Sequence, residues 1–166
     1  QAVDALLWAQ CPRHIGGAWL DVGGAKTRGT WDRDPTFDAW TVVDIADGPD
    51  VTHVCSVTAM PFRSAAFHLV TAVDMLYLLS EGELQIALRE IRRVLRPAGV
   101  LVATLPFSRP ASEPADHARW TPVALRALLG TAGFSRWSIQ ALGGWWSLLL
   151  QLLYDRAYHR SSIRRQ

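Results

Sequence analysis

The chain has 166 residues, of which 49% are hydrophobic and 19% are charged, and its formal net charge at pH 7 is +2. This length and balance are typical of one globular domain and argue against a disordered chain. The 17 basic and 15 acidic residues nearly cancel, so charge gives no case for a nucleic-acid partner. Cys11 and Cys55 lie far apart and the histidines are scattered, so the sequence predicts neither a disulfide framework nor a metal site.

The first residues show no basic segment followed by a long apolar run, so we expect no signal peptide. The longest apolar run, 145–153, contains Ser147 and Gln151 and is too short to cross a bilayer as a helix. We therefore expect a cytoplasmic protein. The C-terminal segment would also allow a location at the surface of a membrane.

The predicted elements alternate along the chain. Apolar and β-branched runs predict strands at 18–22, 40–45, 51–55, 67–73, 100–105 and 134–142. Helical spacing and capping residues predict helices at 2–9, from Ser80 to Arg96-Pro97, from Thr121-Pro122 to Gly130 and Gly133, and at 145–158.

This alternation predicts an α/β fold, with a Rossmann-like, mostly parallel sheet and helices on both faces. We expect a single domain over 1–166, with its core at 18–142 and an apolar C-terminal helix at 145–160. Ligands in such sheets bind at the carboxyl ends of the strands, so the residues that follow strands are the candidates for function.

Two candidates stand directly after predicted strands. The turn LDVGGAKTRG (20–29) is rich in glycine, which lets a backbone approach a ligand closely, but it fits neither the GxGxxG fingerprint nor a P-loop. An ordinary strand-to-loop turn remains the alternative. Asp44 ends the next strand, where a carboxylate can accept hydrogen bonds from both hydroxyls of a ribose. Its alternative is a turn aspartate that opens the loop at 44–50.

Several phrases in fixed order resemble one family, and together they cover roughly residues 19–144. They are LDVGGA (20–25), VVDI (42–45), AMPF (59–62), FHLVTAVDMLYLL (67–79), REIRRVLRPAGVLVATLPF (89–107) and RWTPVALRALLGTAGF (119–134). In this order they resemble the class I S-adenosylmethionine-dependent methyltransferases, particularly the small-molecule and glycan-pathway enzymes.

The resemblance implies S-adenosylmethionine as the cofactor. It implies that Asp44 binds the ribose and that Asp74 faces the methionine part and the methyl group. Met60 and Phe62 are implied to support the loop at the adenine. The residues implied to border the methionine part are Asp21, Gly23, Gly24 and Ala25, and those implied to line the adenine are Ile45, Ser56 and Val57.

The sequence also departs from the family pattern. Departures stand at Ala25, Ser56, His68, Tyr77, Leu78 and Ala98. The first helix is shortened, and the usual last strand of the sheet is missing. These departures keep open a second function, in which a catalytically degenerate methyltransferase-like domain acts as a binding or scaffold partner.

An active enzyme of this type would methylate a small-molecule, sugar or lipid-linked acceptor. A hydroxyl acceptor needs a general base, and the candidates are Asp74, Asp116 and His117. Each has a simpler interpretation: Asp74 as a cofactor contact, Asp116 as a cap or loop charge, and His117 as a solvated loop histidine.

The segment 145–165 joins an apolar helix to a basic end. Arginines follow the helix at 156, 160, 164 and 165. Packing on the sheet is one interpretation. The others are a homodimer or partner-protein contact and contact with a membrane surface.

Overall fold

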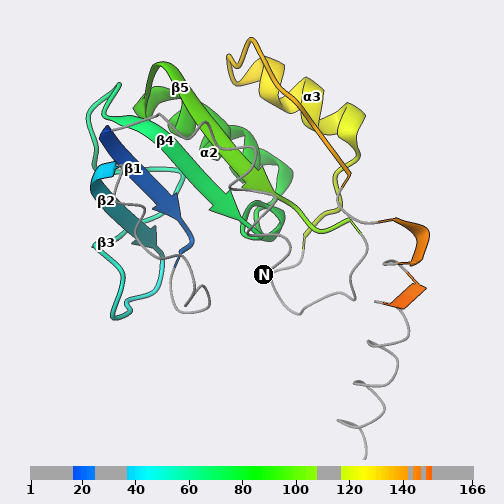
Figure 1. Ribbon diagram of the computed structural model, residues 1–166, viewed down its shortest axis with the longest axis horizontal. Coiled ribbons are helices and arrows are strands. Elements are labelled where there is room, and N and C mark those ends of the chain that lie inside the picture. Colours follow the sequence, from blue (N-terminus) through cyan, green and yellow to red (C-terminus); the bar gives the residue numbers. More distant parts are fainter. Residues whose placement is uncertain (1–16, 25–36, 108–116, 142–143, 147–148, 151–166) are drawn as a thin grey trace, which may run out of the picture.

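The computed structural model describes residues 17–24, 37–107, 117–141, 144–146 and 149–150 (Figure 1). Its elements in chain order are β1 (Gly17–Val22), β2 (Phe37–Asp44), β3 (His53–Val54), β4 (Phe67–Val73), the 3-10 turn η1 (Leu76–Leu78), α2 (Glu81–Val94), β5 (Leu95–Thr104) and α3 (Pro122–Thr131). The predicted helix at 2–9 lies outside the described residues.

The five strands form one parallel sheet in the order β3-β2-β1-β4-β5 (Figure 1). β1 and β4 are hydrogen-bonded neighbours, although β2 and β3 lie between them along the chain. The strand order therefore reverses between β1 and β4, and the carboxyl ends beside such a reversal are the usual ligand position in open α/β sheets. The predicted fold class, a Rossmann-like parallel sheet, is confirmed.

One face of the sheet carries the main aliphatic core. Leu20, Val70 and Ala72 on the strands pack with buried side chains of α2 and with Leu128 of α3. The α2 side chains that enter this core are Leu84, Ala87, Leu88, Ile91 and Val94. Burying each of the larger ones contributes about 1.5–3 kcal/mol, so this face holds α2 firmly over the sheet.

The opposite face is aromatic and contains buried polar groups. Trp19 is fully buried and stacks on Trp40 of the neighbouring strand, with 5.1 Å between the ring centroids. Asp21 and Thr71 are both at most 2% exposed. This face therefore brings a carboxylate into the interior, close to the carboxyl ends of β1 and β4.

Helix α2 begins as predicted and ends earlier than predicted. The Ser80 hydroxyl accepts from the Glu83 amide, and the Glu83 carboxylate accepts from the Ser80 amide, so both halves of the predicted capping box are present. The helix ends at Val94, before the predicted Arg96-Pro97, because Leu95 turns extended and pairs with Phe67 as the first residue of β5. Pairing with β4 therefore decides where α2 ends, and the prediction from Pro97 alone placed the end too late.

The predicted strand at 134–142 is wrong over the residues described. Residues 134–141 form no ladder with any described strand. The Phe134 amide instead donates to the Leu129 carbonyl at 3.0 Å, and the Trp137 ring lies beside Gly130. The segment therefore follows α3, with Phe134 packed against the main core, and it pairs with no described strand. The third strand is also shorter than predicted, since only 53–54 pair with β2.

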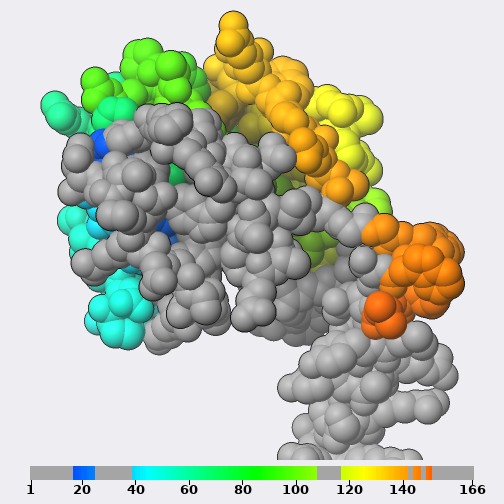
Figure 2. Space-filling view, viewed as in Figure 1, coloured from blue at the N-terminus to red at the C-terminus, as the bar shows by residue number. Residues whose placement is uncertain are grey.

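The described residues of the C-terminal segment are helical and exposed. Trp145, Trp146, Leu149 and Leu150 have exposed fractions of 76%, 74%, 39% and 65% (orange in Figure 2). For these four side chains, the exposed fractions argue against packing on the sheet, which was one of three interpretations of the segment. Within the described part of the chain, no helix is both long enough and apolar enough to cross a membrane.

Candidate functional site

The turn after β1 requires glycine at two successive positions. Gly23 has a φ of +69°, and a Cβ there would lie 2.9 Å from the Cβ of Met75. A Cβ on Gly24 would collide with the Asp21 carboxylate and lie 3.0 Å from a methyl group of Val42. These contacts hold the turn backbone close to the carboxyl ends of β2 and β4, which is where a ligand would lie.

A buried hydrogen-bond chain joins β1 to β4 beneath this turn. The Trp19 indole donates to the Thr71 hydroxyl at 2.9 Å, and that hydroxyl donates to the Asp21 carboxylate at 2.7 Å. Burying a carboxylate is costly unless it is hydrogen-bonded, so the bond from Thr71 stabilises Asp21 in the interior. Asp21 is therefore set beneath the glycine turn and supports it. The sequence prediction of Asp21 gave no sign of its dependence on Thr71.

Asp44 lies at the carboxyl end of β2, with one carboxylate oxygen already used. Its Oδ1 accepts from the Ala46 amide at 2.9 Å, which fixes the side chain in a local turn. The other oxygen, Oδ2, accepts no hydrogen bond from the described residues. The next side chain, Ile45, is 79% exposed. A hydrogen-bond acceptor therefore stands beside an exposed apolar side chain, the combination that a ribose and an attached base require.

Asp74, after β4, adopts a backbone conformation that residues other than glycine rarely use. Its φ is +49°. Thr104, at the end of β5, holds it there: the Thr104 hydroxyl donates to Asp74 Oδ1 at 2.9 Å, and the Asp74 amide donates back to Thr104. Strained conformations of this kind persist where surrounding contacts fix them, often at functional sites. The sequence analysis named Asp74 and missed Thr104.

The loop after β3 lies beside Asp44. The Cys55 amide donates to the Asp44 carbonyl at 2.9 Å, and the Ser56 hydroxyl is paired with the Thr58 hydroxyl at 2.7 Å. The Val57 and Met60 side chains are 4% and 5% exposed and belong to the core. Any contact of Val57 or Met60 with a ligand therefore comes from the backbone, and the Ser56 hydroxyl is already engaged in closing its own turn.

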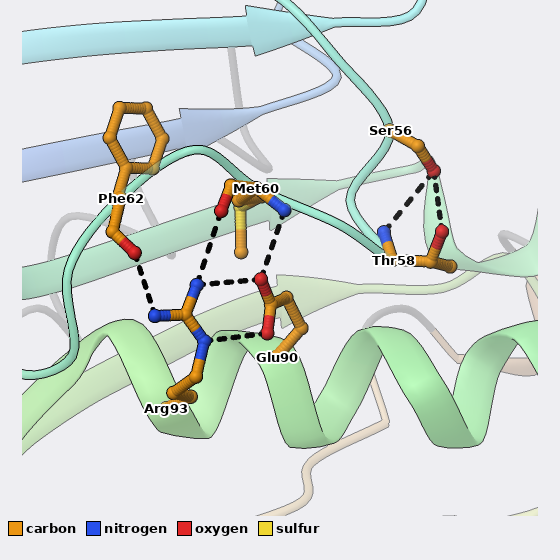
Figure 3. Close-up of polar contacts among 6 residues, drawn as sticks. All are labelled: Ser56, Thr58, Met60, Phe62, Glu90 and Arg93. Atoms are coloured by element: carbon orange, nitrogen blue, oxygen red, sulfur yellow. Dashed lines mark hydrogen bonds and ion pairs between the residues drawn. The ribbon is translucent and has the colours of Figure 1, made fainter.

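Two residues of α2 hold this loop, and the sequence analysis did not single them out. Glu90 and Arg93 form an ion pair at 2.7 Å and contact the backbone of residues 60 and 62 (Figure 3). The hydrogen bond from Arg93 lowers the pKa of Glu90, and the same bond raises the pKa of Arg93. The signal in the sequence was only a Glu and an Arg three apart on a helix, a spacing that most surface helices contain.

His117 lies near the N-terminal end of α2. Glu83 has its pKa lowered chiefly by the hydrogen bond from Ser80, and the His117 charge lowers it further. No hydrogen bond or ion pair joins His117 to Asp74 among the described residues. Ala25 and Asp116 lie outside the part of the chain that the structure describes.

The site is therefore a row along the carboxyl edge of the sheet. From β4 to β3 the row contains Asp74, Gly23, Asp44 and the 56–58 turn. Within the described ranges, no three acidic, histidine or cysteine side chains gather as metal ligands would.

Comparison with known proteins agrees with this architecture. Residues 33–103 match the family model described as a methyltransferase domain. This match covers less than half of the chain. The match and the order of the strands agree with the resemblance in sequence to the class I S-adenosylmethionine-dependent methyltransferases. No curated protein matches the chain.

Solved structures share the fold at low sequence identity. The Burkholderia thailandensis 1,6-didemethyltoxoflavin-N1-methyltransferase, with bound 1,6-didemethyltoxoflavin and S-adenosylhomocysteine, is 20% identical, with a TM-score of 0.60 over 80% of this chain and 65% of that one. The YcgJ protein from Bacillus subtilis is 14% identical, with a TM-score of 0.62 over 79% and 67%. The [4+2]-cyclase SpnF is 24% identical, with a TM-score of 0.60 over 80% and 57%.

This chain thus spans about two thirds or less of the length of these three structures. One of them is described as a cyclase and another as a methyltransferase. The shared fold alone therefore does not decide which reaction a member catalyses.

Proposed function

We propose that this chain binds S-adenosylmethionine and transfers its methyl group to a small-molecule, sugar or lipid-linked acceptor. The observation that carries the proposal is the row at the carboxyl edge, where a glycine-only turn faces the reversal in strand order and Asp44 follows on the next strand. The family match supports the reaction class. The acceptor class rests on the resemblance in sequence.

The residues present fit the cofactor along this row. Asp44 Oδ2 would accept from a ribose hydroxyl, and the exposed Ile45 would pack against the base. Gly23 and Gly24 leave room for the methionine part next to β1, with Asp21 supporting the turn from below. The resemblance in sequence also assigns Ala25 to the border of that part. The base would then lie on the β3 side, beside the Ser56–Thr58 turn and the core residue Met60.

When bound, the cofactor supplies an electrophilic methyl group for in-line attack, so most of the rate must come from positioning. Asp74, held rigidly by Thr104, would orient the methionine end. His117 would accept the proton of a hydroxyl acceptor; this needs the acceptor to reach the N-terminal end of α2. His117→Ala with unchanged turnover would remove that residue from the mechanism.

Calorimetric titration with S-adenosylhomocysteine tests the proposal through Asp44→Asn. The amide keeps the shape and the turn at Ala46 and removes the charge, so we expect affinity to fall about 10–100-fold, since hydrogen bonds to charged groups contribute about 1.5–3 kcal/mol. Asp47→Asn is the matched control, because Asp47 caps the next amide in the same loop at 2.8 Å and should leave affinity unchanged. Wild-type protein that binds neither S-adenosylmethionine nor S-adenosylhomocysteine would favour the alternative, a degenerate domain that serves as a binding or scaffold partner.

The exposed side chains of Trp145, Trp146, Leu149 and Leu150 support a second role, contact with an anionic membrane surface. Tryptophan and leucine suit the boundary between headgroups and acyl chains, and the arginines at 156–165 suit anionic headgroups. We expect the protein to co-sediment with vesicles that contain phosphatidylserine and to be released when Trp145 and Trp146 are both changed to Ala. Unchanged sedimentation of that variant would contradict the role, and a concentration-dependent dimer without vesicle binding would assign the surface to a second copy.

A further inference from the structure

The loop between β3 and β4 follows a strand that makes few hydrogen bonds within the sheet. β3 contributes only His53 and Val54, and both are exposed. After β3, the backbone of this loop bonds to α2: the Ala65 amide donates to the Arg93 carbonyl at 2.9 Å, and the Ala66 amide donates to the Val94 carbonyl at 2.8 Å. The path of the loop is therefore set by a helix that comes later in the chain.

The side chains of Glu90 and Arg93 extend this attachment toward β3. Glu90 Oε1 accepts from the Met60 amide at 2.9 Å. Arg93 donates to the Phe62 carbonyl at 2.6 Å and to the Met60 carbonyl at 3.2 Å. Arg93 also donates to both carboxylate oxygens of Glu90, each at 2.7 Å, so the guanidinium and the carboxylate hold each other in a bidentate pair (Figure 3). We call these two residues the loop clamp.

The segment 55–60 connects the residues held by the loop clamp to the proposed site. The Ala59 amide donates to the Ser56 carbonyl at 3.1 Å, which closes a turn between the clamped Met60 and the end of β3. The other end of this segment is fixed by the Cys55 amide on the Asp44 carbonyl. The turn at 56–58 is thus held from both sides, next to the carboxylate proposed to bind the ribose.

This turn presents backbone groups to a ligand. The Val57 amide makes no hydrogen bond within the described residues. The Val57 side chain is buried, and the Ser56 hydroxyl is engaged by Thr58. A base beside this turn would be recognised by backbone donors and acceptors, which read the hydrogen-bonding edge of a base only if the backbone is fixed.

We propose that Glu90 and Arg93 are positioning residues that set specificity for adenine by fixing the backbone of the 56–58 turn. The inference rests on the proposed function, because it needs the ribose at Asp44 and the methionine part at the reversal between β1 and β4. With those two parts placed, the base lies toward β3, where the clamped turn is. Neither residue touches the cofactor, so each acts through the loop.

The test measures calorimetric affinities for S-adenosylhomocysteine and for its analogue with hypoxanthine in place of adenine. The variants are Arg93→Lys and Glu90→Gln. Arg92→Lys is the control, because the hydrogen bonds of Arg92 within the described residues go to the Gly133 and Leu95 carbonyls and none goes to the loop. A lysine ammonium cannot form the bidentate pair with Glu90 and also donate to the carbonyls of Met60 and Phe62. We expect Arg93→Lys to weaken the affinity for S-adenosylhomocysteine about tenfold and to lower the ratio of that affinity to the affinity for the hypoxanthine analogue. Arg92→Lys should leave the affinity and the ratio unchanged.

The preference ratio separates positioning from stability. A purely structural role would lower the unfolding temperature and leave the ratio unchanged, and that outcome would overturn the inference. If Arg93→Lys does not fold, Glu90→Gln answers the same question, because its amide oxygen still accepts from Met60 while the charge that orients Arg93 is lost. Wild-type protein that binds neither ligand would overturn the proposed function and this inference with it. Binding that Asp44→Asn weakens but Arg93→Lys and Glu90→Gln do not would overturn this inference alone.

Discussion

The carboxyl ends of β1 and β4 are joined through the interior of the sheet, whereas the loop after β3 is joined to the rest of the molecule through helix α2. In the first region a hydroxyl and a carboxylate, Thr71 and Asp21, are buried between neighbouring strands. In the second, the partly exposed pair Glu90 and Arg93 contacts the loop backbone. The two regions flank the same proposed ligand, but they are stabilised by different physical means.

The difference follows from how many neighbouring strands each region pairs with. β1 pairs with β2 and with β4, so its carboxyl end is fixed on both sides. β3 is a short edge strand that pairs only with β2, so its loop needs side chains from elsewhere. The interior junction should therefore depend on shape and on buried hydrogen bonds, and the β3 loop should depend on charge and pH.

The largest expected effect is at the interior junction. Thr71→Val removes the donor to the Asp21 carboxylate without changing the volume of the side chain, and we expect a loss of about 2–3 kcal/mol in the free energy of unfolding, since a buried charged acceptor loses a partner. Urea denaturation measures it. Thr41→Val, on β2 opposite Leu20, is the control and should change stability by less than about 0.5 kcal/mol. Equal effects of the two substitutions would show that the Asp21–Thr71 bond has no special weight.

The glycine turn should give the next largest effect. Gly23→Ala forces a side chain into a left-handed backbone against Met75, and we expect a loss of about 1–2 kcal/mol together with weaker binding of S-adenosylhomocysteine. Gly82→Ala is the control with the opposite sign. Gly82 lies in α2 with nothing within 4 Å of an added Cβ, so alanine there should stabilise the protein by about 0.5–1 kcal/mol. Two losses of similar size would mean that the turn does not require glycine for the reason given.

The smallest effect should come from the loop clamp, and it should depend on pH. The pKa of Glu90 is lowered in the folded protein, so its stabilisation is complete above the unfolded pKa and is lost as the pH falls through the folded pKa. Because the pair is partly exposed, we expect wild type to exceed Glu90→Gln in the free energy of unfolding by about 1 kcal/mol at pH 7 and by almost nothing near pH 3.

Asp50→Asn, in the exposed loop after β2, is the control for that measurement. The difference between wild type and Asp50→Asn should stay below about 0.5 kcal/mol at pH 7, because Asp50 has no side-chain partner among the described residues. A pH-independent difference for Glu90→Gln would show that the carboxylate charge does not hold the loop, and would reduce the contrast between the two regions to a difference in burial.

Local sequence patterns predicted a large part of the fold. The strand at 67–73 is confirmed at both ends, the capping box at Ser80 and Glu83 is present, and Thr121 caps α3 with Pro122 in its first turn. Each of these depends on residues within a few positions of one another. Gly23 and Gly24 were recognised for the same reason, since a strand that ends in two glycines marks a tight turn.

The tertiary structure decided what these elements meet. Thr71 lies 50 positions from Asp21, Thr104 lies 30 from Asp74, and Glu90 lies 30 from Met60. No spacing rule along the chain reaches such partners. The segment at 134–141 has the apolar content of a strand but follows α3, because a strand exists only where a neighbouring edge accepts its hydrogen bonds. The sequence therefore determined the elements and the glycine turn, and the order of the strands determined which side chains share the carboxyl edge, because contacts between distant residues form only when the sheet is assembled.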